Sequence, residues 1–328
     1  MRKSYQELHY AFEKVLLKYQ FTVEKAKSIA TIFSNNSRDG VYSHGLNRFP
    51  VFIDYLKQGF IDKDAEPTLI NSFGIIEQWD GNLGSGVLNA QFAMTRAIKL
   101  AKEKGMACIA LKNTNHWMRG GTYGWQAADA GCIGINFTNT IAIMPPWGAE
   151  EPALGNNPLI IAVPRKEGHI VLDMAMSQFS YGKLQEHELK GEDLPYYGGY
   201  DEHGEMSKDP KAIRETQRTL PAGMWKGSGL ALMLDILASI LSGGNTTAAI
   251  SKSEKEMAIS QVFICFDADK FDGKDRIIEE ILEFTKCAKP IKGSNIRYPG
   301  EETLRIRIEN MEKGIPVDEK MWEKLMNL

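Results

Sequence analysis

The sequence is poor in cysteine and has no long apolar run. Four cysteines occur among 328 residues, at positions 108, 132, 265 and 287, and no two of them form a C-x-x-C pair. The first three lie in apolar, strand-like stretches, so we expect reduced, buried thiols in a reducing compartment, and neither disulfides nor a metal site. The most apolar stretch, 229–241, contains Asp235 and is shorter than the ~20 residues needed to span a bilayer. We therefore expect no transmembrane segment.

Neither sign of charge is in clear excess. The 39 basic and 42 acidic residues leave a formal net charge of −3, which gives no electrostatic reason to expect a nucleic-acid or anionic-membrane partner. The first 20 residues place apolar side chains at helical spacing with charges between them, and they lack the uninterrupted apolar stretch of a secretory signal. We therefore expect a cytoplasmic protein.

Two common enzyme signatures are absent from the sequence. There is no G-x-G-x-x-G, because the near misses at 84–86 and 227–229 have Asn89 and Leu232 in the third glycine position. A Rossmann domain is therefore not supported. There is also no G-x-S-x-G nucleophile elbow, so we give little weight to Ser43 as a hydrolase nucleophile activated by the histidine beside it.

Apolar periodicity predicts an α/β chain with helices at both ends. Helices are expected over 4–19, 22–38, 48–58 with Asn47 as N-cap, 87–104 ending at Gly105, 226–241 as a buried helix, 273–287, 301–313 and 318–326. Strands are expected over 75–80, 106–112, 133–138, 159–164, 169–175 and 261–267. The polar segment 186–224 is expected to be a long loop that serves as a lid or a dimer contact.

We expect one continuous fold over 1–328. In it, 1–74 and 270–328 are mainly helical, while 75–269 form an α/β core that binds cofactor and substrate.

Two of the six histidines have neighbours suited to catalysis. No two histidines have the i, i+3 or i, i+4 spacing of helical metal ligands, and solvated side chains are expected for His9, His187 and His203. His44 in GVYSHGLNRFP and His116 in NTNHWMRGG lie in loop-like segments rich in polar residues and glycine.

Arg48 follows His44 by four residues, so both could face one pocket. An arginine can hold a carboxylate and a histidine can protonate an alkoxide, but residue chemistry alone leaves the reaction of this site open. The pair Trp225-Lys226 could flank an adenine ring and a phosphate, or simply pack at a helix start.

Five segments of the chain resemble the malate/L-lactate dehydrogenase family, whose members lack a Rossmann fold. These segments are GVYSHGLNRFP (40–50), NHWMRGGTYGWQAADAGCIGI (115–135), MPPWGAEEPALGNNPLIIAVP (144–164), LDMAMSQFSYGKL (172–184) and LPAGMWKGSGLALMLD (220–235). The resemblance runs from about residue 4 to 326. It implies a mixed-sheet α/β fold like that of L-sulfolactate and malate dehydrogenases, with a helical layer from both chain ends. It also implies a homodimer, with the cofactor in an extended groove close to the subunit interface.

The resemblance also implies roles for individual residues. The family's proton donor falls on His44, and its substrate-side neighbours match Ser43, Arg48 and His116. The implied cofactor contacts are His169, Ile170, Val171, Leu172, Asp173, Met174, Ala175, Trp225, Lys226, Gly300, Glu301 and Glu302, and no metal is implied. Asn156 stands where many relatives have Thr, which leaves the nicotinamide contact or the substrate choice open.

The implied reaction is hydride transfer from NADH, with NADPH possible, to the 2-keto group of a small 2-oxo sugar acid. Arg48 would hold the carboxylate and His44 would protonate the new alkoxide. Glu301 or Glu302 could accept the ribose hydroxyls, although acidic residues also favour a helix start. Two alternatives stay open: a sister dehydrogenase acting on malate, lactate, ureidoglycolate or a cyclic imino acid, and a non-catalytic sugar-acid-binding protein.

Overall fold

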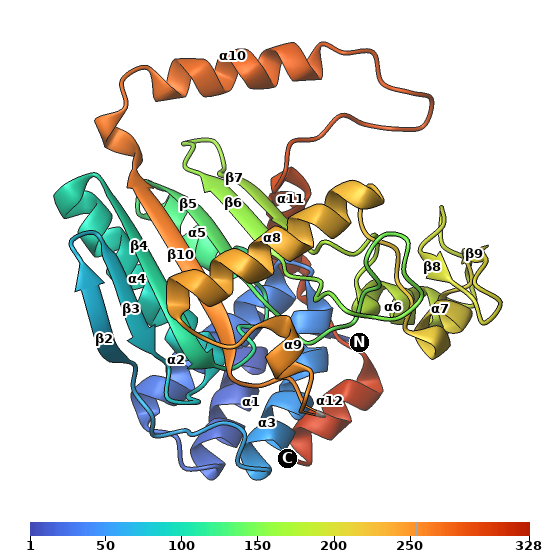
Figure 1. The fold of residues 1–328 in the computed structure, drawn as a ribbon, viewed down its shortest axis with the longest axis horizontal. Coiled ribbons are helices and arrows are strands. Elements are labelled where there is room, and N and C mark those ends of the chain that lie inside the picture. The colour runs from blue at the N-terminus through green and yellow to red at the C-terminus, as the bar shows by residue number, and fades with distance from the viewer. Residues whose placement is uncertain (254) are drawn as a thin grey trace.

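A mixed sheet of seven strands forms the centre of the molecule (Figure 1). The computed structural model describes residues 1–253 and 255–328. The strand order is β2-β3-β4-β10-β5-β6-β7, and of the pairs in this sheet only β3 with β4 is parallel. The strands are β2 (Thr68–Phe73), β3 (Ile76–Asp80), β4 (Met106–Thr114), β5 (Cys132–Thr138), β6 (Leu159–Val163), β7 (Ile170–Met174) and β10 (Ile259–Asp267).

Helices cover both faces of this sheet. Strand β4 shows the reason, because Ile109 and its alternate neighbours join one buried cluster, while Cys108 and Ala110 join the other. The first cluster is covered by α4 (Gly86–Lys104) and α5 (Gly121–Asp129), and the second by α8 (Trp225–Ser242). The predicted strands and the helix ending at Gly105 are confirmed.

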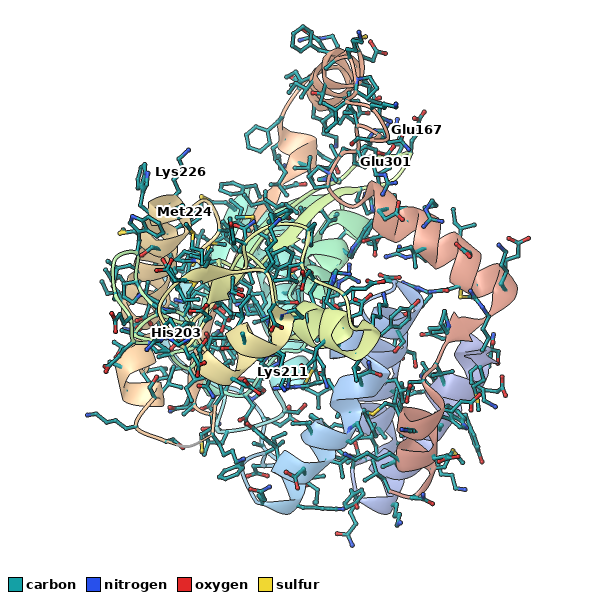
Figure 2. All side chains as sticks on the ribbon, turned by 90° about the vertical axis from the view of Figure 1, so that its right-hand side faces the viewer. Glu167, His203, Lys211, Met224, Lys226 and Glu301 are labelled. Atoms are coloured by element: carbon teal, nitrogen blue, oxygen red, sulfur yellow. The ribbon has the colours of Figure 1, made fainter. Side chains whose placement is uncertain are left out.

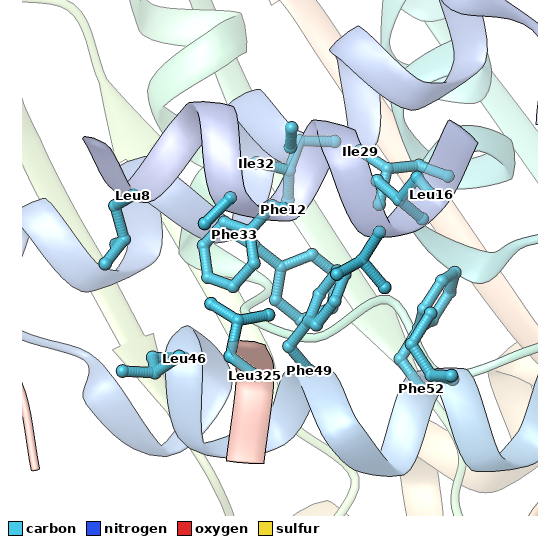
Figure 3. Close-up of a cluster of buried hydrophobic side chains, with 14 of the residues drawn as sticks. Leu8, Phe12, Leu16, Ile29, Ile32, Phe33, Leu46, Phe49, Phe52 and Leu325 are labelled. Carbon is cyan, nitrogen blue, oxygen red and sulfur yellow. The ribbon is translucent and has the colours of Figure 1, made fainter. Parts of the chain in front are cut away.

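The N-terminal helices form a separate apolar layer with the C-terminal helix (Figure 3). The helices are α1 (Tyr5–Lys18), α2 (Val23–Arg38), α3 (Phe49–Lys57) and α12 (Glu319–Met326). Phe12, Phe33 and Phe49 pack their rings within 6 Å of one another at the centre, and Leu325 of α12 joins them. The expected N-cap Asn47 was wrong: a 3-10 turn, Leu46–Arg48, precedes α3, and Arg48 takes the cap position.

The segment 186–224 is not the structureless loop that its glycines and prolines predicted. It contains the second half of α6 (Tyr181–Lys190), the short strands β8 (Gly199–Tyr200) and β9 (Met206–Ser207), and α7 (Pro210–Thr216). These elements enclose a small core of Phe179, Leu184, Leu194 and Ile213. Four apolar residues spread over 35 positions are too sparse for a periodic signal, so the prediction missed them.

Two histidines expected to be solvated are largely covered. The side chain of His9 is 18% exposed and hydrogen-bonds Thr31 at 3.1 Å, and that of His187 is 16% exposed. Only His203 of the three is well exposed, at 77%. Both covered rings lie on helices, where packing against a neighbouring element removes water that a loop position would keep.

Helix α8 was expected to be buried, but only 33% of it is. One face packs on the sheet, while Leu232, Met233, Ile236 and Ile240 on the remaining surface are 40–68% exposed. With 18 residues and a mean hydropathy of 1.2, α8 is long and apolar enough by composition alone to cross a membrane. A helix with apolar residues on all sides is expected to be buried on all sides. In this chain, other residues pack against only one side of α8.

The C-terminal segment leaves the body and returns to it. Helix α10 (Lys274–Lys286) stands apart from the sheet in Figure 1, and Phe284 on it is 84% exposed. The chain then enters α11 (Glu301–Lys313) beside β7. The chain also forms α9 (Thr247–Ile250), a 3-10 turn at Ala268–Lys270, and the pair β1 (Arg2–Lys3) with β11 (Ile315–Pro316). All four cysteines are free, and Cys287 after α10 is exposed, contrary to the expectation of buried thiols throughout.

Candidate active site

His44 lies in a tightly held turn at the end of α2. Residues Tyr42–His44 form a 3-10 turn whose last carbonyl accepts a hydrogen bond from Asn36 Nδ2 at 2.9 Å. Ser37 Oγ accepts from the Leu46 backbone N–H at 3.0 Å, just beyond the turn. These bonds fix the His44 backbone to α2, so the imidazole is positioned by the helix and not by a mobile loop.

The structure brings His44 and His116 together. Their rings stack with centroids 5.8 Å apart and an angle of 14° between planes. Ser43 Oγ lies 3.0 Å from His44 Nδ1, while the Met118 N–H donates to His116 Nδ1 at 2.9 Å. A neutral His116 therefore carries its proton on Nε2, which faces Glu256 Oε1 at 4.0 Å.

The surroundings keep both rings neutral. Burial is the main cause that lowers the pKa of His44 to about 4, the charges of Arg48 and Arg119 contribute to this shift, and Asp173 opposes it. Burial, Arg48 and His44 hold the pKa of His116 well below its usual value. Arg48 is thus close enough for its charge to act on both imidazoles.

A cavity of about 430 Å³ opens beside these rings. Its wall is formed by Val41, Ser43, His44, His116, Trp117, Met118, Arg119, Gly120, Thr138, Thr140, Asn156, Pro158, Val171, Leu172, Asp173, Ala175, Ser180, Ile259, Pro299, Gly300 and Thr303. Three of the four residues expected near the substrate line the cavity. Arg48, the fourth, is not among the lining residues, although its charge acts on both imidazoles.

Strand β7 supplies one side of the cavity, but only part of the expected cofactor segment lines it. Val171, Leu172, Asp173 and Ala175 belong to the wall, whereas Ile170 and Met174 do not. His169 is also outside the wall, because its Nε2 lies 2.9 Å from Asp129 Oδ1 and its Nδ1 accepts from the Arg165 N–H at 3.1 Å.

Gly300 begins α11 directly against β7. With a φ of 95°, it approaches so closely that a Cβ would lie 3.1 Å from the Val171 nitrogen. Glu301 and Glu302 follow but do not line the cavity in the described part of the chain. Their carboxylates pair instead with Lys286 at 2.9 Å and Arg297 at 2.8 Å, respectively.

Trp225 and Lys226 begin α8 close to the end of β7 but outside the cavity wall. The Ala222 N–H donates to the Met176 carbonyl at 2.8 Å, which ties the preceding turn to the chain after β7. Trp225 is 65% exposed. Figure 2 shows Lys226 and Glu301 on the two sides of the upper part of the molecule, beneath α10.

Two charged residues of the site were missed by sequence reasoning. Arg119 is 6% exposed and lines the cavity, between carboxylates of Asp39 and Asp173. Glu256 faces His116, and burial raises its pKa while a hydrogen bond from the Ile141 N–H and the charge of Arg48 lower it. Arg119 could have been found three residues after His116, whereas Glu256 reaches the site only through the fold.

The site suits an elongated cofactor. The cavity follows β7 from Gly300, which touches Val171, to Asn156, whose carbonyl accepts from the Met176 N–H at 2.7 Å. A strand of this length spans about 17 Å, so a ligand lying along it would be extended. Among the residues described, no group of three or more His, Cys, Asp or Glu side chains could hold a metal ion.

Comparisons with known proteins agree on one family. The family model described as malate/L-lactate dehydrogenase matches residues 3–326. Proteins named 2,3-diketo-L-gulonate reductase from Haemophilus influenzae and Pasteurella multocida are 47% and 46% identical over 333 residues, covering 100% of both chains. The solved sulfolactate dehydrogenase of Methanocaldococcus jannaschii is 31% identical with a TM-score of 0.88, covering 99% of this chain and 95% of its own.

A second solved structure, malate dehydrogenase from Entamoeba histolytica, is 26% identical with a TM-score of 0.93, covering 100% of this chain and 96% of its own. These likenesses confirm the expected mixed-sheet fold without a Rossmann domain. The chain therefore belongs to the malate/L-lactate dehydrogenase family and is an oxidoreductase that acts on CH–OH and C=O groups with a nicotinamide cofactor.

Proposed function

We propose that this chain is a 2,3-diketo-L-gulonate reductase that reduces the 2-keto group to give 3-keto-L-gulonate, with His44 as proton donor. The observation that carries the proposal is the His44–His116 pair, which lies on the cavity wall within range of the charge of Arg48. Relatives named for this activity match the chain over its full length at 44–47% identity, which supports the choice of substrate.

The chemistry divides between the cofactor and the side chains. The bound nicotinamide supplies a hydride to C2 of the substrate. His44 gives a proton to the oxygen on that carbon, so that the ketone becomes a hydroxyl group without leaving an alkoxide. Ser43 at 3.0 Å from Nδ1 orients the ring in either protonation state.

Arg48 links substrate binding to the protonation of His44. Its charge helps to hold the pKa of His44 low. A substrate carboxylate paired with Arg48 would offset that charge and raise the pKa of His44 toward its ordinary range. The substrate thereby favours the protonated imidazole that the reduction consumes.

We propose NADH as the cofactor, held by 169–175, Trp225, Lys226 and 300–302. Glu301 or Glu302 would accept the ribose hydroxyls after exchanging a present ion-pair partner for them. NADPH is the competing cofactor, and comparing kcat/KM for the two tests the ribose role directly. Equal kcat/KM values for NADH and NADPH would mean that neither glutamate binds the ribose hydroxyls.

We propose a cytoplasmic homodimer as the working form. Residues 1–328 would act as one continuous fold, with 75–269 as the cofactor- and substrate-binding core and the mainly helical 1–74 and 270–328 around it. The exposed apolar residues of α8, together with Phe284 on α10, support an interface on this side of the molecule.

A substrate panel tests the proposal against its rivals. NADH oxidation is followed by absorbance with 2,3-diketo-L-gulonate, pyruvate and oxaloacetate. Rapid oxidation with the sugar acid alone is the expected result. Activity with pyruvate or oxaloacetate alone would mean that the protein is a sister dehydrogenase with a different substrate. If NADH is not oxidised with any of the three acids, a non-catalytic binding protein is favoured.

A further inference from the structure

Arg119 joins the two halves of the site. Its Nη1 donates to Asp39 Oδ2 at 2.9 Å, and its Nε donates to Asp173 Oδ2 at 3.3 Å. The guanidinium is 6% exposed and lies on the cavity wall. One buried side chain therefore contacts both the end of α2 and strand β7.

The Asp39 end of this contact is rigidly connected to His44. Asp39 is the C-cap of α2, and the Asn36 and Ser37 side chains hydrogen-bond the chain at His44 and Leu46. Thr122 at the start of α5 donates to Asn36 Oδ1 at 2.7 Å and holds that side chain in place. A displacement of Asp39 would therefore carry His44 with it.

The Asp173 end belongs to the strand that would hold the cofactor. Asp173 lies opposite Ile160 in the β6–β7 pairing, and its Oδ2 also accepts from the Gly121 N–H at 3.0 Å. It is therefore held from the sheet and from the start of α5. The position of Asp173 therefore fixes where strand β7 lies relative to Arg119.

We infer that Arg119 is a positioning residue for the reaction: by bridging Asp39 and Asp173 it sets the distance between the His44 imidazole and the cofactor strand β7. This inference rests on the proposed function, because it assigns the two sides of the bridge to proton donor and cofactor. A misplacement of about 1 Å between reacting groups can cost about 100-fold in rate.

The charges around Asp39 allow this bridge to be broken selectively. Asp39 is 4% exposed and also pairs with Arg38 at 2.8 Å and Arg307 at 2.7 Å. Burial alone would raise its pKa, but the Arg307 hydrogen bonds and the charges of the three arginines hold it below the usual value. Removing Arg119 leaves Asp39 with two cationic partners, so the buried carboxylate stays compensated.

Two substitutions separate geometry from charge. Arg119→Lys keeps the charge but lacks the fork that reaches both carboxylates, while Arg119→Met removes charge and contact together. Arg307→Met is the matched control: Arg307 binds the same Asp39 and lies 4.3 Å over the Trp125 ring, but it does not reach β7.

We expect both Arg119 variants to lose about tenfold or more in kcat, with the Kd for NADH changed less than threefold. Arg119→Met should also raise the pKa of His44, because Arg119 helps to lower it. Arg307→Met should lower the melting temperature and keep kcat within about twofold. Wild-type kcat in Arg119→Lys, or equal kcat losses in Arg307→Met and Arg119→Met, would overturn the inference.

Loss of NADH affinity in proportion to kcat would overturn it as well, since Arg119 would then be a cofactor ligand. Hydrogen exchange supplies a readout without turnover: exchange in 41–48 and 170–176 should rise in both Arg119 variants and stay unchanged in Arg307→Met. If the wild-type protein reduces no 2-oxo acid, the proposed function fails while this measurement still decides whether the bridge holds the two segments. Unchanged exchange would refute the bridge itself.

Discussion

His44 and His116 stack with ring centroids 5.8 Å apart, and each keeps Nδ1 occupied by a neighbour of its own. The arrangement leaves the two Nε2 atoms for other partners. Because the rings are nearly parallel at 14°, they do not hydrogen-bond each other, and one does not serve as the base for the other. In the proposed mechanism His44 is the group that exchanges a proton with substrate, and His116 does not take part in that transfer as its base.

The protonation of His44 predicts that the rate of reduction increases as the pH is lowered. In the proposed mechanism the reduction uses the His44 imidazolium, and burial is the main cause that holds the pKa of His44 at about 4 in the empty site. At pH values above this, the protonated fraction falls about tenfold per unit, so kcat/KM for reduction should decline as pH rises. The pH profile of kcat should decline at higher pH than that of kcat/KM, because substrate at Arg48 raises the pKa. A kcat/KM that increases with pH above 5 would contradict His44 as donor.

Glu256 predicts a charge effect on substrate affinity. Its carboxylate faces His116 at 4.0 Å and lies near Arg48, where it would weaken the attraction for an anionic substrate. Glu256→Gln should lower the KM for 2,3-diketo-L-gulonate about two- to tenfold at neutral pH. The difference should shrink at acid pH, where the wild-type carboxyl is itself protonated. Steady-state KM at several pH values measures this, and a pH-independent rise in KM would refute it.

Asn156 predicts a change in substrate preference. Its Oδ1 accepts from Thr140 Oγ1 at 3.2 Å, which leaves the amide nitrogen as a donor on the cavity wall. Asn156→Thr should lower the ratio of kcat/KM for 2,3-diketo-L-gulonate over pyruvate about fivefold, the effect of one hydrogen bond of ~1 kcal/mol. An unchanged ratio would show that Asn156 does not contribute to substrate preference.

The neighbouring Asn157 provides the control. It is fully buried, accepts from the Thr140 N–H at 3.0 Å and donates to the Ala231 carbonyl at 2.8 Å. Asn157→Ala should lower the free energy of unfolding by about 1–3 kcal/mol without the selective loss of sugar-acid activity.

The exposed face of α8 predicts the oligomeric state. Ile236 and Ile240 lie one helical turn apart and are 40% and 68% exposed. Replacing both with Lys should convert the proposed dimer to a monomer, as measured by light scattering after gel filtration. Tyr10 on α1 is 67% exposed and lies outside both α8 and 186–224, so Tyr10→Lys should leave the mass unchanged. A monomeric wild-type protein would remove the proposed interface.

Local sequence rules explained most of the framework. Gly105 ends α4 at a φ of 94°, as its place after 87–104 predicted, and Thr22 caps the predicted helix α2 through the Lys25 N–H. The apolar runs 106–112 and 261–267 predicted strands, which the structure confirms as β4 and β10. The elements within 186–224 escaped because their small core depends on contacts between Leu184 and Ile213, which are 29 positions apart.

The site was only half visible in the sequence. His44, Arg48 and His116 could be recognised from the polar residues around them in the sequence. In the structure the two histidine rings stack, and the charge of Arg48 acts on His44. Asp39, Arg119 and Glu256 did not, because a charged residue in a sequence gives no sign of being buried. Their roles arise where α2, the start of α5 and the chain before β10 meet, which no local pattern records.

The central claim is that His44 donates the proton. It is tested most directly by measuring kcat for NADH oxidation with 2,3-diketo-L-gulonate in the wild type and in His44→Asn. The asparagine cannot supply the proton, so kcat should fall about 10²- to 10⁴-fold while NADH binds with unchanged Kd. Full turnover by His44→Asn at neutral pH would contradict the account.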